Sequence, residues 1–281
     1  MADPVSGLRE TDEVLEEPSP FTITLERYDG AERVVTVPDG ITKIGRKAFA
    51  NNRYIHEVIL PESVTEIDEE AFASCVNIER LAIPPRVVSI GAGAFKGCWK
   101  LEEAVVPHGV HELLPRTFAR CRLLSRLVLP DGITTIGEAC FQHCGSIESL
   151  HLPEKLERIG EASFYNCQKL TFESFPASLD TIENDAFRKC GSLEELDIPD
   201  SIGWIGQRCF QECASLRSVM LPETLDFIEE GTFQGCSGLE VVVVGKALSH
   251  IESKAFAQTG LARDDISLPD GCVVADDAFD A

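Results

Sequence analysis

The sequence has no long apolar run and comparatively few basic residues. No segment approaches the roughly 20 consecutive apolar residues that cross a bilayer, so no membrane insertion is expected. Lysine and arginine number 25 against 47 aspartate and glutamate residues, which gives a net charge of -22. Nucleic acids and anionic membranes bind basic patches, and this balance argues against both as partners. Two interpretations of the acidity stay open: a well-solvated surface, or electrostatic attraction of a basic partner protein.

A secretion signal is also missing from the start of the sequence. Residues 1–20, MADPVSGLRETDEVLEEPSP, contain neither the basic nor the apolar region of a signal peptide, and their acidic composition is typical of a flexible tail. The eleven cysteines are spread over a long chain, unlike the disulfides of small secreted domains. We therefore expect an intracellular, cytoplasmic protein with unpaired cysteines. The alternative is a cell-surface or secreted protein whose leader has been removed.

Catalytic motifs are absent from the sequence. The run from His111 to Pro115 begins like a zinc-protease helix but lacks the second histidine. Neither a G-x-x-x-x-G-K-[ST] phosphate loop nor a G-x-S-x-G turn occurs. The sequence thus predicts neither an enzyme nor a cofactor. One cluster still needs an explanation, because CFQHC (140–144) places two cysteines and a histidine close together, as a metal site would.

What the sequence does contain is a 23-residue repeat. Proline recurs at this interval at Pro38, Pro61, Pro84, Pro107, Pro130, Pro153, Pro176, Pro199 and Pro222, and Gly245 takes the next slot. Eleven residues after each slot stands Phe49, Phe72, Phe95, Phe118, Phe141, Phe164, Phe187, Phe210, Phe233 or Phe256. Fourteen residues after the slot, eight repeats have Cys75, Cys98, Cys121, Cys144, Cys167, Cys190, Cys213 or Cys236. Such a unit cannot bury its apolar face alone, so successive repeats must stack into a solenoid.

Alignment of the repeats explains the CFQHC cluster. Phe141 and Cys144 occupy the regular phenylalanine and cysteine slots, and Cys140 fills a slot that holds Ala, Thr or Ser in other repeats. His143 lies in a variable polar slot. We therefore interpret the cysteines as small, buried core residues in the reduced state, and we predict no metal site. A metal or catalytic site built from Cys140, His143 and Cys144 is the disfavoured alternative.

The repeat predicts an α/β solenoid of one domain. The residues before each proline alternate between apolar and polar, which predicts a parallel β-sheet on the concave wall. The segment that carries the phenylalanine is too short for an ordinary helix, so we expect short helical or 3-10 turns on the opposite wall. The predicted divisions are a flexible acidic tail (1–20), an N-terminal β-hairpin cap (21–37), the solenoid (38–268) and a C-terminal partial repeat (269–281).

The repeat LPDGITTIGEACFQHCGSIESLHLP (129–153) resembles the BspA-like, or Treponema-type, leucine-rich repeat, and the resemblance extends over residues 34–279. It implies a curved leucine-rich-repeat solenoid. Members of this family are often bacterial or protozoan surface proteins that bind host or neighbouring-cell proteins, while others are intracellular. This sequence departs from the surface members because it shows neither a leader nor a C-terminal anchor or sorting segment.

Candidate binding residues lie in the variable slots of the repeat. Outward-facing apolar positions on the concave wall are Ile59, Val105, Val128, Met220 and Val243. Two residues earlier in their repeats, the same wall carries Arg80, Arg126 and Phe172. Trp204 and Phe227 put aromatic rings into an otherwise polar slot of adjacent repeats, which predicts an aromatic patch. The repeat with Phe172 is irregular, because Glu173 stands in an apolar slot; either the strand shifts register or an acid is half buried.

We therefore expect a non-catalytic scaffold that binds another protein on the concave wall or on the aromatic patch. The first alternative is a surface adhesin that binds extracellular or host proteins. An ordinary β-sheet surface without a partner explains the apolar row equally well, and packing against a tail or loop explains the aromatic pair. The sequence makes no prediction of the oligomeric state.

Overall fold

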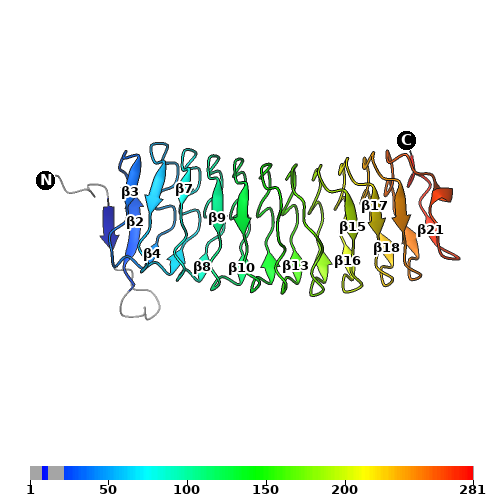
Figure 1. The fold of residues 1–281 in the computed structure, drawn as a ribbon, viewed down its shortest axis with the longest axis horizontal. Helices are drawn as coiled ribbons and strands as arrows, with labels where there is room; N and C mark the ends of the chain where they lie inside the picture. Colours follow the sequence, from blue (N-terminus) through cyan, green and yellow to red (C-terminus); the bar gives the residue numbers. More distant parts are fainter. Residues whose placement is uncertain (1–7, 12–21, 281) are drawn as a thin grey trace.

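The computed structural model describes residues 8–11 and 22–280 as an elongated β-solenoid whose rungs, one per repeat, stand in a row along one axis (Figure 1). Within these ranges there is no α-helix, and the only helix is the short 3-10 helix η1 (Arg263–Asp265). The predicted α/β class is therefore corrected to a β-solenoid with parallel sheets. No helix in the described part of the chain has the length and hydropathy to span a bilayer.

Most rungs contribute strands to two walls. The first set, after the proline slot, consists of β2 (Thr24–Tyr28), β4 (Lys43–Ile44), β6 (Glu66–Ile67), β8 (Ser89–Ile90), β10 (Glu112–Leu113), β12 (Thr135–Ile136), β13 (Arg158–Ile159), β14 (Thr181–Ile182), β16 (Trp204–Ile205), β18 (Phe227–Ile228), β20 (His250–Ile251) and β21 (Val273–Val274). The second set, before the proline, consists of β3 (Val34–Thr36), β5 (Glu57–Ile59), β7 (Arg80–Leu81), β9 (Glu103–Val105), β11 (Arg126–Val128), β15 (Glu195–Asp197), β17 (Ser218–Met220) and β19 (Val241–Val243).

Both sets pair in parallel with the register of the repeat. Lys43 of β4 faces Glu66 of β6, and Glu57 of β5 faces Arg80 of β7, each 23 residues further along. In Figure 1 the labelled strands of the second set from β3 to β17 run along the upper half, and those of the first set from β4 to β18 along the lower half. The predicted parallel pairing before the prolines is confirmed, except that the rungs before Pro153 and Pro176 are joined only by an isolated bridge between Ser149 and Thr171. The sequence did not predict the two-residue strands of the first set.

The third wall is made of reverse turns. In the rung after β4, the amide of Ala48 donates to the carbonyl of Gly45 (3.1 Å), whereas the amide of Lys47 donates to Glu69 in the next rung (3.1 Å). Alternate amides therefore bond within the rung and between rungs. Lys47 and the residue four positions later have φ values of 57° and 64°, and the same two slots are positive in every repeat, filled by sixteen non-glycine residues and four glycines. A helix needs its successive amides to bond internally, so the predicted helical turns are corrected to β-turns.

A stack of aromatic rings fills the centre of the solenoid. The ten repeat phenylalanines are all buried, with neighbouring ring centroids 4.9–5.7 Å apart and planes within 17° of each other. Tyr28 closes the stack at the N-terminal end, 5.3 Å from Phe49, and Phe279 extends it beyond Phe256 at 5.2 Å. Because each ring of the stack lies between the rings of the preceding and following rungs, the core is a one-dimensional array.

The cysteines form a second ladder beside the rings. Each of the eight repeat thiols donates a hydrogen bond to the carbonyl of the phenylalanine in the preceding rung, at Sγ···O distances of 3.0–3.2 Å. In the first rung, Asn52 occupies the cysteine slot and its amide donates to Gly30 (2.8 Å). Cysteine combines a small apolar side chain with a weak donor, which suits a buried slot facing a carbonyl. The eight thiols are buried and unpaired, as predicted.

The N-terminal end differs from the predicted hairpin over residues 21–37. β2 pairs in parallel with β4 and β3 with β5, so the two strands lie in different sheets and the segment is a shortened rung. This pairing buries Leu25, Val35 and Val37 against the next rung, which outweighs the local turn signal at Tyr28-Asp29-Gly30. β1 (Leu8–Thr11), inside the predicted tail, pairs antiparallel with β2. The rest of the predicted tail lies outside the described residues.

Candidate interaction surfaces

The outward surface of the second strand set, which we call the strand face, is the wall predicted to be concave. Inward and outward side chains alternate along each strand, as the buried Val58 between the less buried Glu57 and Ile59 illustrates. The predicted apolar row is exposed: the side chains retain between 42% and 51% of their accessible surface at Ile59, Val105, Val128, Met220 and Val243. Apolar surface is thus available to a partner on this face.

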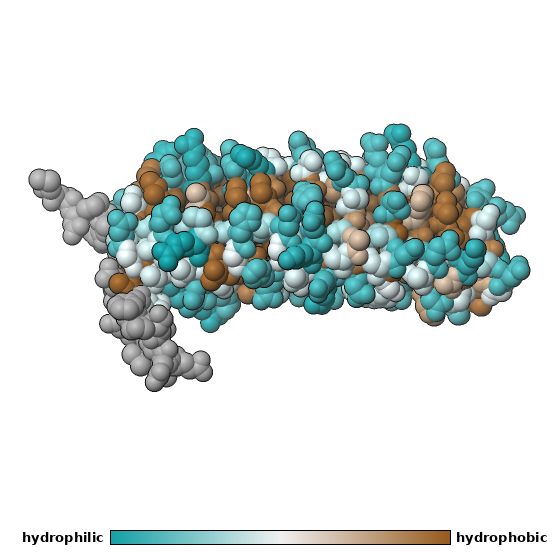
Figure 2. All heavy atoms as spheres, turned by 60° about the horizontal axis from the view of Figure 1, so that its bottom comes forward, coloured by the Kyte–Doolittle hydropathy of each residue, from teal (hydrophilic) through white to brown (hydrophobic). Residues whose placement is uncertain are grey.

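The apolar row is interrupted in the middle of the molecule. The rungs between β11 and β17 place polar residues in the row, namely His151, Glu173 and Asp197. Two patches result, one around Val105 and Val128 and a C-terminal one where Val241 adds to Met220 and Val243. Seen from another direction, the molecule likewise shows apolar side chains in a broken band along its length rather than in one continuous sheet (Figure 2).

A groove of about 700 Å³ runs across the N-terminal half of the strand face. Its lining comes from β5, β7, β9 and β11 and includes Ile59, Ala82 and Val105. The predicted charged residues Arg80 and Arg126 also line it, together with the glutamates Glu57, Glu79, Glu102 and Glu103. The predicted apolar and charged rows therefore meet in one concave site.

The charges at this groove are only weakly engaged with each other. Arg126 pairs with Glu103 at 3.0 Å, but both side chains are about half exposed or more, and such pairs contribute little to stability. Glu79 lies 3.2 Å from His56 and 3.7 Å from Lys100. Because breaking these exposed ion pairs costs little free energy, the charged side chains at the groove can exchange them for contacts with a partner.

Phe172 does not join the outward row, and the prediction that placed it there is wrong. Its ring lies 4.8 Å from that of Phe175 and 5.6 Å from that of Phe187, in contact with the central stack. Ser149 bridges to Thr171, an offset of 22 residues instead of 23, and a one-residue slip exchanges the two faces of a strand. Of the two alternatives that the sequence leaves open, the structure shows the register shift, and Glu173 is exposed.

The predicted aromatic patch lies on the first strand set, on β16 and β18. Trp204 and Phe227 remain 38% and 39% exposed, so neither is covered by the described residues. The indole nitrogen of Trp204 donates to Glu229 at 3.3 Å. The ring of Phe227 stacks on His250 of β20 with centroids 4.8 Å apart and planes 10° apart. These contacts hold each ring in place with one face or edge open to solvent.

The CFQHC cluster is divided between core and surface. Cys140 and Cys144 are fully buried, and the Cys144 thiol donates to Phe118. Burial raises the pKa of the Cys140 thiol, which disfavours the thiolate that a metal would require. The His143 ring instead accepts a hydrogen bond from Asn166 at 2.9 Å. Among the residues that the structure describes, no group of three or more His, Cys, Asp or Glu side chains is placed to hold a metal ion.

Comparison with known families agrees with this architecture. The family described as "BspA type Leucine rich repeat region (6 copies)" matches residues 33–148 and 134–262, which is most of the chain. The chain belongs to the BspA-type leucine-rich repeat family. The phenylalanine and cysteine ladders are therefore the repeat core of a BspA-type protein. A comparison with curated protein sequences found no match.

Solved structures of similar proteins share the fold of this BspA-type chain. A leucine-rich repeat protein from Bacteroides ovatus is 25% identical with a TM-score of 0.63, over 94% of this chain and 82% of that one. A leucine rich cell surface protein from Faecalibacterium prausnitzii is 24% identical with a TM-score of 0.55, over 92% and 86%. A leucine-rich repeat protein from Eubacterium ventriosum is 18% identical with a TM-score of 0.56, over 96% of this chain and 82% of that one.

Proposed function

We propose that this chain is a non-catalytic interaction module that binds another protein in the groove on the N-terminal half of its strand face. The observation that carries the proposal is the groove itself, about 700 Å³ in volume and lined by exposed apolar side chains between charged ones. Exposed apolar surface with a polar rim is typical of protein-binding sites. The walls are parallel sheets held by hydrogen bonds, so the site is formed before a partner arrives.

The charges of the groove favour a partner with apolar anchors and basic flanking residues. Four glutamates line the groove against two arginines, Arg80 and Arg126. The chain as a whole carries a net charge of -22, which attracts a basic protein over long range at low ionic strength. We therefore expect association to slow as salt is added, with a smaller effect on dissociation.

A paired substitution tests the proposal. The purified chain and an Ile59→Lys/Val105→Lys variant, in which both substitutions lie in the groove, are used to capture proteins from native lysate, and captured partners are then titrated in purified form. We expect the variant to weaken binding at least about tenfold, because it places two positive charges among apolar contacts and opposes a basic partner. The matched control is Met220→Lys/Val243→Lys, which makes the same change in the same row outside the groove. Equal binding by wild type and the groove variant contradicts the proposal, provided that melting temperatures are unchanged.

The aromatic pair is the second candidate surface. Trp204 and Phe227 are half-exposed rings in adjacent rungs, and tryptophan in particular is a frequent interface anchor. A Trp204→Ser/Phe227→Ser variant separates the two candidates. Loss of the partner in this variant, with full binding by the groove variant, would keep the binding function and move it to the first strand set.

The cellular compartment of the protein, intracellular or at the cell surface, is also a proposal. The Faecalibacterium relative is described as a cell surface protein, which favours an adhesin role, whereas the expectation from the sequence is an intracellular scaffold. Ten of the eleven thiols are buried and protected in either environment, so the cysteine content does not discriminate between them. Antibody labelling of cells distinguishes the two compartments. Labelling without permeabilisation supports the adhesin, and labelling only after permeabilisation supports the intracellular scaffold.

A further inference from the structure

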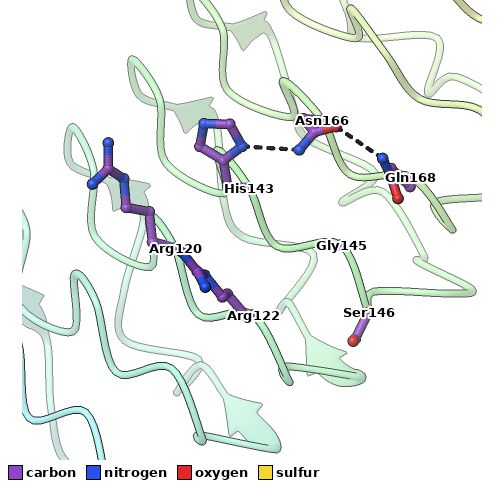
Figure 3. Close-up of a pocket in the computed structure, with 7 residues that line it drawn as sticks. All are labelled: Arg120, Arg122, His143, Gly145, Ser146, Asn166 and Gln168. Carbon is purple, nitrogen blue, oxygen red and sulfur yellow. Dashed lines mark hydrogen bonds between the residues drawn. The ribbon is translucent and has the colours of Figure 1, made fainter.

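A polar pocket of about 510 Å³ opens on the turn wall, away from both surfaces described above (Figure 3). Three successive rungs line it, with Arg120 and Arg122 on one side and Asn166 and Gln168 on the other. His143, Gly145 and Ser146 lie between these two sides. No acidic residue is part of the lining, although the chain carries 47 of them.

The pocket exists because one rung has small residues where its neighbours have large ones. Gly145 occupies the slot that holds Trp99, Arg122 and Gln168 in nearby rungs. A Cβ atom placed on Gly145 would meet nothing closer than the Asn166 carbonyl at 4.0 Å, so open space takes the place of a side chain. The gap between Arg122 and Gln168 therefore results from the glycine at position 145.

The cationic groups at the pocket lack carboxylate partners. Within residues 22–280, neither Arg120 nor Arg122 forms an ion pair, whereas Arg116 and Arg126 close by are paired with Glu138 and Glu103. The guanidinium of Arg122 lies over the Trp99 ring at 4.7 Å. Such stacking fixes the plane of the guanidinium and leaves its N–H edge free to donate.

A hydrogen bond from Asn166 fixes the tautomer of the neutral His143 ring. An amide nitrogen can only donate, so Asn166 Nδ2 at 2.9 Å makes Nδ1 of His143 the acceptor and leaves the proton of the neutral ring on Nε2. Gln168 in turn donates to Asn166 Oδ1 at 3.3 Å, which holds the amide in this orientation. The lining residues thus carry two guanidinium groups and an imidazole N–H as donors, and none of them is a carboxylate.

We propose that this pocket binds a sugar-sized molecule through a tetrahedral oxyanion, a sulfate or phosphate ester. Arginine pairs with such oxyanions in a bidentate fashion, and both guanidinium groups are available for this. A cavity of about 510 Å³ is larger than a bare ion needs and lies in the range of small-molecule sites. The proposal goes beyond the protein-binding role and does not depend on it.

Calorimetric titration of the full chain tests the proposal with four probes: inorganic sulfate, inorganic phosphate, glucose 6-sulfate and glucose 6-phosphate, with glucose as the neutral control. We expect saturable binding of at least one sugar ester in physiological salt, tighter than that of the bare ions. Sulfate and phosphate esters distinguish the two sources of the oxyanion. No saturable binding of any probe at millimolar concentration overturns the proposal.

Two variants locate the site. Arg120→Gln/Arg122→Gln removes the cationic groups, and Gly145→Leu fills the cavity without any change of charge; each should weaken binding at least about tenfold. The control Arg27→Gln/Arg46→Gln removes two exposed arginines far from the pocket and should leave affinity within about twofold. Undiminished binding by Gly145→Leu shows that the anion binds elsewhere and overturns the assignment.

The pKa of His143 supplies an independent measure of ester binding in the pocket. Burial, followed by the charges of Arg120, Arg122 and Lys189, holds its pKa below the usual range, and the edge of the Tyr165 ring packs against it at 5.2 Å. A bound oxyanion offsets these positive charges. An NMR titration should therefore show the pKa of His143 rising on saturation with the ester, whereas an unchanged pKa contradicts binding beside this ring.

Discussion

Removal of one ring from the middle of the aromatic stack should cost far more stability than removal of one at its end. Phe141 is fully buried, between Phe118 at 5.7 Å and Phe164 at 5.3 Å, whereas Phe279 is partly buried at the end of the stack, with its ring 5.2 Å from that of Phe256. Phe141→Ala should lower the free energy of unfolding by about 4–5 kcal/mol, because it removes a fully buried ring and leaves a cavity; this is the upper part of the usual range for such a substitution. With one neighbour and partial burial, Phe279→Ala should cost about 1–2 kcal/mol.

Urea unfolding followed by circular dichroism measures both values. The free energy of unfolding of Phe141→Ala should fall by the larger amount, and its slope against urea should decrease, because a weakened middle rung lets the two halves of a one-dimensional array unfold separately. For Phe279→Ala the slope should stay that of the wild type. Equal costs at the two positions, or a cost below about 2 kcal/mol at Phe141, would refute a stack in which each ring depends on two neighbours.

Three further predictions follow from local features. Of eleven thiols, only the half-buried Cys272 should react with a thiol reagent in the native protein, and rapid reaction of a second thiol would contradict the buried ladder. Burial and its hydrogen bond to Glu32 raise the pKa of Tyr28 to about 12, so its neutral form stabilises the fold below pH 10 and that contribution is lost between pH 10 and 12; Tyr28→Phe should remove this part of the pH dependence of unfolding. Lys254→Gly, at a φ of 56° where the preceding rung has Gly231, should raise the free energy of unfolding by about 0.5–1 kcal/mol, and a loss in thermal denaturation would speak against strain there.

The period of the core was readable from the sequence because the same residue types recur in every rung. Phenylalanine and cysteine at fixed offsets from proline predicted which side chains are buried, and the strands before each proline followed from alternation. Phe279 was missed because the last proline slot slips by one residue, which hides its equivalence to Phe256. The first strand set was missed because two-residue strands such as Lys43–Ile44 are too short to show a period.

Features that depend on pairing between rungs could not be predicted from the sequence. Tyr28-Asp29-Gly30 resembles a hairpin turn, but the adjacent strands gain more from two separate parallel sheets. Phe172 turns inward because its strand slips by one residue, which composition alone does not reveal. The polar pocket had a sequence signal, since Gly145 stands between Arg122 and Gln168 in its slot, but its meaning depends on Arg120 and Arg122, which form no ion pair within residues 22–280. Exposure of the apolar row was predicted correctly, while its role in binding stays a prediction.

Site-specific photocrosslinking tests the binding proposal most directly. A photoreactive amino acid is placed at position 105 in the groove, at position 243 in the same row beyond the groove, or at position 254 on the turn wall, and the protein is irradiated with its captured partner. If the partner binds across the N-terminal half of the strand face, a covalent adduct forms from position 105 and from neither of the others. An adduct from position 243 or 254, with none from position 105, would contradict the proposal.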